Sequence, residues 1–261
     1  MHPLHSLIIG KVRKLLDNTN IGIVCIDGPT AAGKTILAED LAKIINSQLS
    51  IKVDFYRLDW TLKKRLEREN DLENLMNDND PFYFEGELHM HLNKYKNFLE
   101  ELHIFKKNVY SYKFKEIEKS LLIKDLYSRE MGGTCEGEHS YDLSSEKTLI
   151  ICEGHYTSRS EFRNLIDLNI CLLADKDELL KRKINRVKDY RSPKSAIDYF
   201  KKIDIPSFSY HISRFYRNID IFVDNTDYLN PLIISPNKIG DWFLKDIDKF
   251  NNNTKILDKK I

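Results

Sequence analysis

The sequence predicts an α/β fold in which a parallel sheet carries helices on both faces, and its apolar runs are the first observation that predicts it. Runs typical of buried strands fall at 21–27, 148–152, 168–174 and 219–223, and a shorter run at 50–54 predicts a further strand. Helical patterns lie between these runs. Strands that alternate with helices in this way predict a parallel sheet, and right-handed crossovers follow from that.

The second observation is the stretch "IGIVCIDGPTAAGKT" at 21–35, where an apolar strand stops at Asp27 and a loop of small residues follows. The spacing G-x-x-x-x-G-K-T is typical of a phosphate-binding loop, and an amphipathic helical pattern follows it. Backbone N–H groups of such a loop surround an anion, and the helix dipole adds positive potential. We expect Lys34 to reach the outer phosphates and the Thr35 hydroxyl to hold Mg²⁺. The residues expected to bind ATP in this loop are Gly28, Pro29, Thr30, Ala31, Ala32, Gly33, Lys34 and Thr35.

The segments between the strands complete the predicted order. A charged stretch at 60–80 predicts a surface helix, and 86–105 predicts another. The stretch "REMGGTCEGEHS" at 129–140 predicts a loop, and the polar end at 248–261 predicts a frayed tail. Because the sequence contains neither an internal repeat nor a linker rich in Pro, Gly or Ser, we expect one domain.

Length and composition limit the class of protein. The 261 residues are enough to bury a full core, and 41 basic against 40 acidic residues argue against a nucleic-acid partner. The apolar runs are shorter than the roughly 20 residues that span a bilayer, and the N-terminus lacks the pattern of a signal peptide. We therefore expect a cytoplasmic protein without membrane contact, whose four cysteines are reduced.

Four further stretches carry a resemblance to a known family. They are "VDFYRLDW" at 53–60, "DPFYFEGEL" at 80–88, "TLIICEGHYTSRSEFRNLIDLNICLL" at 148–173 and "KRKINRVKDYRSP" at 181–193. In this order they resemble the uridine kinase and phosphoribulokinase family of P-loop small-molecule kinases, and the uridine kinase-like branch best. The resemblance implies ATP- and Mg²⁺-dependent phosphorylation of an alcohol, and a P-loop-type sheet with a helical lid and an acceptor-binding excursion. It implies a single kinase domain over 1–261, with its core at about 20–225, the acceptor side at 60–147 and the lid at 181–193.

The catalytic base is a choice between two aspartates. Asp54 ends the short run "LSIKVD", near the carboxyl edge of the expected sheet, where open α/β sheets bind ligands. A carboxylate there can accept the proton of an attacking hydroxyl. Many members of the family carry the acid one residue earlier, where this chain has Val53. Asp54 is therefore the first candidate, and Asp59 is the alternative.

Glu153 ends the strand "LIIC", and the resemblance implies that it faces the metal together with Thr35. An acid at the end of such a strand can bind Mg²⁺ directly, because Mg²⁺ prefers oxygen ligands, or can bind a water on the metal. We expect Lys34 and Glu153 to act with the aspartate in catalysis.

The lid stretch supplies arginines. Arg182 and Arg186 lie one helical turn apart and share a face. Guanidinium groups suit phosphate oxygens because they are planar, permanently charged and bidentate. We expect these two side chains to bind ATP when the site closes, and we expect Arg191 to contact the acceptor.

The acceptor itself is less well defined. The residues in segments that contact the acceptor in the family are Tyr56, Glu85, Tyr110 and Tyr112. Aromatic rings stack on bases, so a uridine- or cytidine-like nucleoside is the first interpretation. The alternatives are a sugar, a polyol or a pantothenate-like alcohol, or an ATP-binding regulator that transfers no phosphate. The resemblance also favours self-association into a homo-oligomer.

Overall fold

The computed structural model describes residues 2–70, 89–111, 119–128, 130–144, 146–189 and 191–236. Its central sheet has the strand order β2-β5-β1-β6-β7-β8. The strands are β1 (Ile21–Asp27), β2 (Lys52–Arg57), β5 (Thr148–Glu153), β6 (Leu168–Leu173), β7 (Ile221–Asp224) and β8 (Leu232–Ile234). All neighbours pair in parallel except β7 and β8, which are antiparallel. The predicted α/β fold with a mostly parallel sheet is confirmed.

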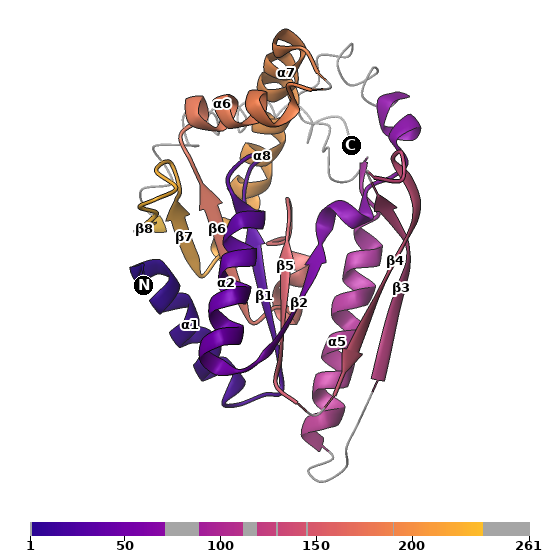
Figure 1. Ribbon diagram of the computed structural model, residues 1–261, viewed down its shortest axis with the longest axis vertical. Helices are drawn as coiled ribbons and strands as arrows, with labels where there is room; N and C mark the ends of the chain where they lie inside the picture. Colours follow the sequence, from indigo (N-terminus) through magenta and orange to yellow (C-terminus); the bar gives the residue numbers. More distant parts are fainter. Residues whose placement is uncertain are drawn as a thin grey trace, which may run out of the picture.

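Helices connect these strands (Figure 1). The α-helices are α1 (Pro3–Leu16), α2 (Lys34–Leu49), α5 (Leu92–Ser111), α6 (Lys176–Val187), α7 (Pro193–Tyr199) and α8 (Ile205–Phe215). Shorter turns are the 3₁₀ segments η1 (Leu58–Thr61), η2 (Ser160–Leu165) and η4 (Tyr216–Asn218), and the π-helical turn η3 (Phe200–Asp204). Within the described part of the chain, no helix combines the length and the apolar character needed to cross a bilayer.

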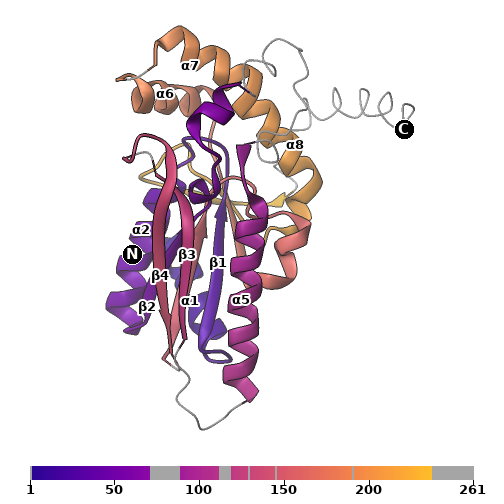
Figure 2. The same ribbon diagram turned by 90° about the vertical axis from the view of Figure 1, so that its right-hand side faces the viewer.

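Both faces of the sheet are covered, because successive side chains of a strand point to opposite faces. In β1, Val24 and Ile26 join a buried cluster with α1 and α2. Ile23 and Cys25 of the same strand join a second cluster with α5 on the other face. Figure 2 shows α5 and α1 on the two sides of the sheet. The fully buried runs of β1 and β5 follow from this double cover.

A β-hairpin packs outside α5 and was not predicted. Strands β3 (Lys119–Ser128) and β4 (Thr134–Leu143) pair antiparallel. The predicted loop at 129–140 is therefore wrong for 134–140, where the alternation of half-buried and exposed residues is typical of a strand with one solvated face. Tyr141 fixes the hairpin: its ring lies 4.8 Å from that of Phe98 on α5, and its hydroxyl donates to the carbonyl of Phe55 over 2.7 Å.

Strand β2 ends later than the sequence predicts, and this shift decides which aspartate reaches the edge of the sheet. The apolar run at 50–54 predicted an end at Asp54, but the strand spans Lys52–Arg57. Asp54 pairs with Ile150 in the middle of β5, and Arg57 pairs with Glu153 at its end. Because β2 is an edge strand and mostly half-exposed, no apolar run marks where it stops.

Candidate active site

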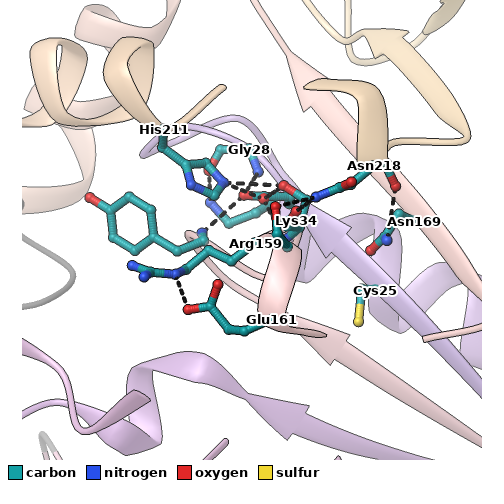
Figure 3. Close-up of polar contacts among 12 residues, drawn as sticks. Cys25, Gly28, Lys34, Arg159, Glu161, Asn169, His211 and Asn218 are labelled. Atoms are coloured by element: carbon teal, nitrogen blue, oxygen red, sulfur yellow. Dashed lines mark hydrogen bonds and ion pairs between the residues drawn. The ribbon is translucent and has the colours of Figure 1, made fainter. Parts of the chain in front are cut away.

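The phosphate-binding loop joins β1 to α2 and is closed around a lysine. The Lys34 ammonium donates hydrogen bonds to the carbonyls of Gly28 and Pro29, each over 2.9 Å (Figure 3). Gly28 has a φ of 149°, and a Cβ there would lie 2.3 Å from the carbonyl oxygen of Leu172. Only glycine therefore allows the chain to turn at this point beside β6.

Thr35 and Glu153 meet at the start of α2. The Thr35 hydroxyl donates to Oε1 of Glu153 over 3.2 Å, and the Glu153 side chain is almost fully buried. Burial raises the pKa of Glu153, although the nearby Lys34 opposes that effect. Burial likewise lowers the pKa of Lys34, against the attraction of Glu153 and other acids. A hydroxyl and a carboxylate at this distance are the oxygen ligands that Mg²⁺ takes, so these residues fit the metal that the sequence implies.

Asp59 lies on η1, which packs directly against the loop after Glu153. Gly154 has a φ of 155°, and a Cβ there would lie 2.4 Å from the Cβ of Leu58. The next residue, Asp59, lines the same cavity as Lys34 and Glu153, and its charge helps to raise the pKa of Glu153.

Asp54 has a different environment. Its carboxylate accepts hydrogen bonds from the backbone N–H of Phe55 over 2.8 Å and from Nε2 of His139 over 3.2 Å. It is absent from the described residues that line the cavity. The geometry therefore favours the alternative aspartate, Asp59, over the first candidate, because β2 continues past Asp54.

Helix α6, which carries the predicted lid arginines, contacts both the phosphate-binding loop and the residues after β7. Arg182 donates to the carbonyls of Asn225 over 2.9 Å and Thr226 over 2.7 Å. Arg186, one turn later, donates to the Thr30 hydroxyl over 3.1 Å. Helices α6 and α7 lie across the carboxyl ends of the strands (Figure 1).

A buried ion pair joins α6 to the helical segment η3. Lys183 donates to Asp204 on η3 over 2.6 Å, and both side chains are buried while lining the cavity. The Lys183 ammonium and the Arg191 guanidinium each lie 4.8 Å from the ring of Tyr199. This pair could not be predicted, because its members lie 21 positions apart on different helices.

One large cavity of about 1420 Å³ is lined by the charged and polar residues Lys34, Thr35, Asp59, Glu153, Arg182 and Arg186. One half lies between the phosphate-binding loop, the start of α1 and the turn after β7, where Tyr228, Leu229 and Pro231 form the wall. The other half lies beyond Asp59, and we call it the acceptor half. Its wall consists of Leu62, Arg65, Arg68, Glu69, His89, Met90 and Tyr127. These residues were not predicted, although the basic stretch at 63–68 could have suggested the two arginines.

The predicted acceptor residues are mostly elsewhere. Tyr56 is fully buried, with its ring stacked 4.4 Å from that of Phe98, so it belongs to the core and not to the cavity wall. Tyr110 lies on the last turn of α5, about 27 Å along the helix from its cavity end. Glu85 and Tyr112 lie outside the described residues. Arg191 lines the cavity, but on the lid side.

The fold and site define a P-loop kinase of small molecules. The chain belongs to the Phosphoribulokinase / Uridine kinase family, whose sequence model matches residues 23–228. No curated protein sequence matches it.

Solved structures share its fold. It is similar to a possible uridine kinase from Bacillus stearothermophilus, with a TM-score of 0.54 and 17% identity over 83% of this chain and 98% of that chain. A phosphoribulokinase from Rhodobacter spheroides gives a TM-score of 0.55 and 15% identity over 78% of this chain and 70% of that chain. A D-glycerate 3-kinase from Cryptococcus neoformans gives 0.56 and 12% identity over 90% of this chain and all of that chain (100%).

Proposed function

We propose that this protein transfers the γ-phosphoryl group of ATP to a hydroxyl of a small molecule, with Mg²⁺ as cofactor. The observation that carries the proposal is that Lys34, Glu153 and Asp59 line one cavity. A cation for the phosphates, an acid for the metal and a further acid for the acceptor are the parts that phosphoryl transfer needs.

In this proposal, the phosphate-binding loop and the lid helix α6 bind the nucleotide. When ATP binds, the Lys34 ammonium leaves the two carbonyl oxygens and binds phosphate oxygens instead. The Arg186 guanidinium supplies a second cation from α6. Thr35 and Glu153 would hold Mg²⁺, which would supply positive charge to offset that of the phosphates. Arg182 keeps the lid attached to the turn after β7, which borders the nucleotide half of the cavity.

Asp59 is the proposed base. It accepts the proton of the acceptor hydroxyl as that oxygen bonds to the γ-phosphorus. The bond from the γ-phosphorus to the bridging oxygen breaks at the same time, and ADP leaves with that oxygen. Lys34 and Arg186 stabilise the charge on the transferring group, so most of the catalysis is positioning and electrostatics.

Two arginines in the acceptor half favour an acceptor that carries an anionic group. Arg68 is oriented by hydrogen bonds to the Lys63 carbonyl over 3.0 Å and the Tyr127 hydroxyl over 2.8 Å. Arg65 lies one turn before it and lines the same wall. Guanidinium pairs bind carboxylates and phosphates. We therefore propose a hydroxy acid or a sugar phosphate ahead of the neutral nucleoside, whose expected partners Tyr56 and Tyr110 lie away from the cavity.

The test is to incubate the protein with ATP, Mg²⁺ and separate pools of hydroxy acids, sugar phosphates, sugars and nucleosides, and to detect phosphorylated products by mass spectrometry. A product in an anionic pool supports the full proposal. A nucleoside product supports the kinase and rejects the anionic acceptor. ATP binding without a product in any pool favours a regulator instead.

A further inference from the structure

Asp27, the last residue of β1, accepts hydrogen bonds from two loops of the site. Its carboxylate is buried and accepts hydrogen bonds on both oxygens. Oδ1 accepts from the backbone N–H of Gly28 over 2.7 Å and of Tyr156 over 3.1 Å. Oδ2 accepts from the Ser158 N–H over 3.0 Å, from the Ser158 hydroxyl, and from Nε2 of His211 over 2.9 Å. One side chain thus connects the start of the phosphate-binding loop to the loop that follows β5.

His211 reaches this carboxylate from α8. It is fully buried, and its ring meets the edge of the Tyr156 ring at 5.0 Å and 82°. Figure 3 shows it beside Gly28 and Lys34, with its contacts directed toward the loop. Burial raises the pKa of Asp27, but His211 and the Ser158 donors outweigh it and hold that pKa below its usual value. The carboxylate is therefore ionised and held by several donors.

The loop that Asp27 holds directly follows Glu153, the acid that faces the metal site at the end of β5. Residues 154–158 follow Glu153 directly, and the N–H of Gly154 donates to the carbonyl of Ile26 over 3.1 Å. Tyr156 has a φ of 72°, a left-handed conformation that a residue with a side chain rarely adopts. Its N–H bond to Asp27 helps to keep it there. When the hydrogen bond from the Tyr156 N–H to Asp27 is lost, we expect the loop after Glu153 to change conformation.

We infer that Asp27 and His211 are positioning residues for the nucleotide site, which hold the phosphate-binding loop and the loop behind Glu153 in mutual register. The inference rests on the proposed function, because it is ATP and Mg²⁺ that this register serves. The pair acts through Gly28 and Glu153 and touches neither ligand. A side chain that only stabilises the fold would alter the melting temperature and leave the affinity for ATP unchanged.

The experiment compares two substitutions at one position. His211→Gln keeps an N–H donor near Nε2, whereas His211→Leu leaves the Asp27 carboxylate without it. Ile212→Ala is the matched control, because Ile212 is buried on the same helix but belongs to the apolar cluster beside β6 and β7. Isothermal titration with Mg·ATP and thermal unfolding are measured for all four proteins. Since a hydrogen bond to a charged group is lost, we expect about tenfold weaker Mg·ATP binding for His211→Leu. We expect His211→Gln to bind within about twofold of the parent.

Ile212→Ala should melt at a lower temperature and bind Mg·ATP like the parent. The inference is overturned if His211→Leu binds Mg·ATP as tightly as the parent, or if Gln fails to restore the affinity. Should His211→Leu not fold, Ser158→Ala removes a single hydroxyl donor to Asp27 and must weaken Mg·ATP binding in the same direction. A parent that binds no Mg·ATP rejects the proposed function and the inference with it. A parent that binds while His211→Leu is unaffected rejects the inference alone.

Discussion

The Thr35 hydroxyl donates a hydrogen bond to Glu153 over 3.2 Å, although 118 positions separate the two residues in the chain. The contact brings the first turn of α2 and the end of β5 together, so that a hydroxyl and a carboxylate that would hold Mg²⁺ lie side by side. It also leaves a carboxylate almost fully buried beside a lysine, and burial raises its pKa.

Glu153→Gln should therefore stabilise the free protein and weaken its function. A raised pKa in the folded state means that the folded protein binds the proton more tightly than the unfolded chain does. The contribution of Glu153 to the free energy of unfolding thus falls as pH rises from the ordinary pKa of a glutamate to its raised pKa in the folded protein. The destabilising effect of the buried charge persists at neutral pH. Gln removes this effect. We expect a higher melting temperature than the parent without ligand, and a smaller rise on adding Mg·ATP. Glu39→Gln, a half-exposed acid on α2, is the control. A lower melting temperature for ligand-free Glu153→Gln contradicts this prediction.

Lys34→Ala removes the cation inside the phosphate-binding loop. We expect turnover to fall by about a hundredfold or more, because charge on the transferring group loses a preorganised partner. The far-ultraviolet circular dichroism should stay that of the parent. Lys43→Ala, on the exposed face of the same helix, should keep full turnover. Parental turnover by Lys34→Ala would mean that this loop does not hold the transferring phosphate.

Substitution of the two predicted lid arginines, Arg182 and Arg186, should have different kinetic effects, because the two side chains have different contacts. Arg186→Ala loses the cation that reaches Thr30 and should lower kcat, whereas Arg182→Ala loses the attachment to the turn after β7 and should raise the KM for ATP. Steady-state kinetics distinguish the two effects. Lys181→Ala, which is exposed on the same helix, should change neither constant. Unchanged kinetics in both arginine variants would mean that α6 has no role in nucleotide binding or closure of the site.

Arg65 should act on the acceptor alone. For an anionic acceptor, Arg65→Ala should raise the acceptor KM about tenfold and leave the KM for ATP unchanged, because a charge-assisted hydrogen bond is lost. Its neighbour Lys64 is exposed and absent from the described cavity wall, so Lys64→Ala is the control. An acceptor KM that is equal in all three proteins would remove the argument for an anionic acceptor.

The sequence predicted the strands that are buried on both faces, because such strands appear as continuous apolar runs. Strands β1, β5 and β6 were predicted within one residue at either end, because helices cover both of their faces. The phosphate-binding loop was equally clear, since its glycines and lysine have a fixed spacing. The end of strand β2 was misplaced because it is an edge strand with half-exposed residues, and Asp54 therefore lies in mid-strand and not at the edge of the sheet.

Contacts between distant segments could not be predicted. Asp27 meets His211 across 184 positions, and nothing in either neighbourhood indicates the pair. The family resemblance of its segment predicted Tyr56 as an acceptor contact, but on β2 its side chain is buried in the core. The cytoplasmic location and the self-association stay predictions.

The central claim is that phosphoryl transfer occurs in the cavity between Lys34 and Asp59, and one measurement tests it most directly. Formation of the phosphorylated product is followed by mass spectrometry for the parent, Asp59→Asn and Asp54→Asn, with Mg·ATP binding measured in parallel. A positioned base contributes roughly a hundred- to ten-thousand-fold, so Asp59→Asn should lose at least about a hundredfold in product formation while it still binds Mg·ATP. Asp54→Asn should stay close to the parent. Loss of product in Asp54→Asn with full activity in Asp59→Asn would contradict the account.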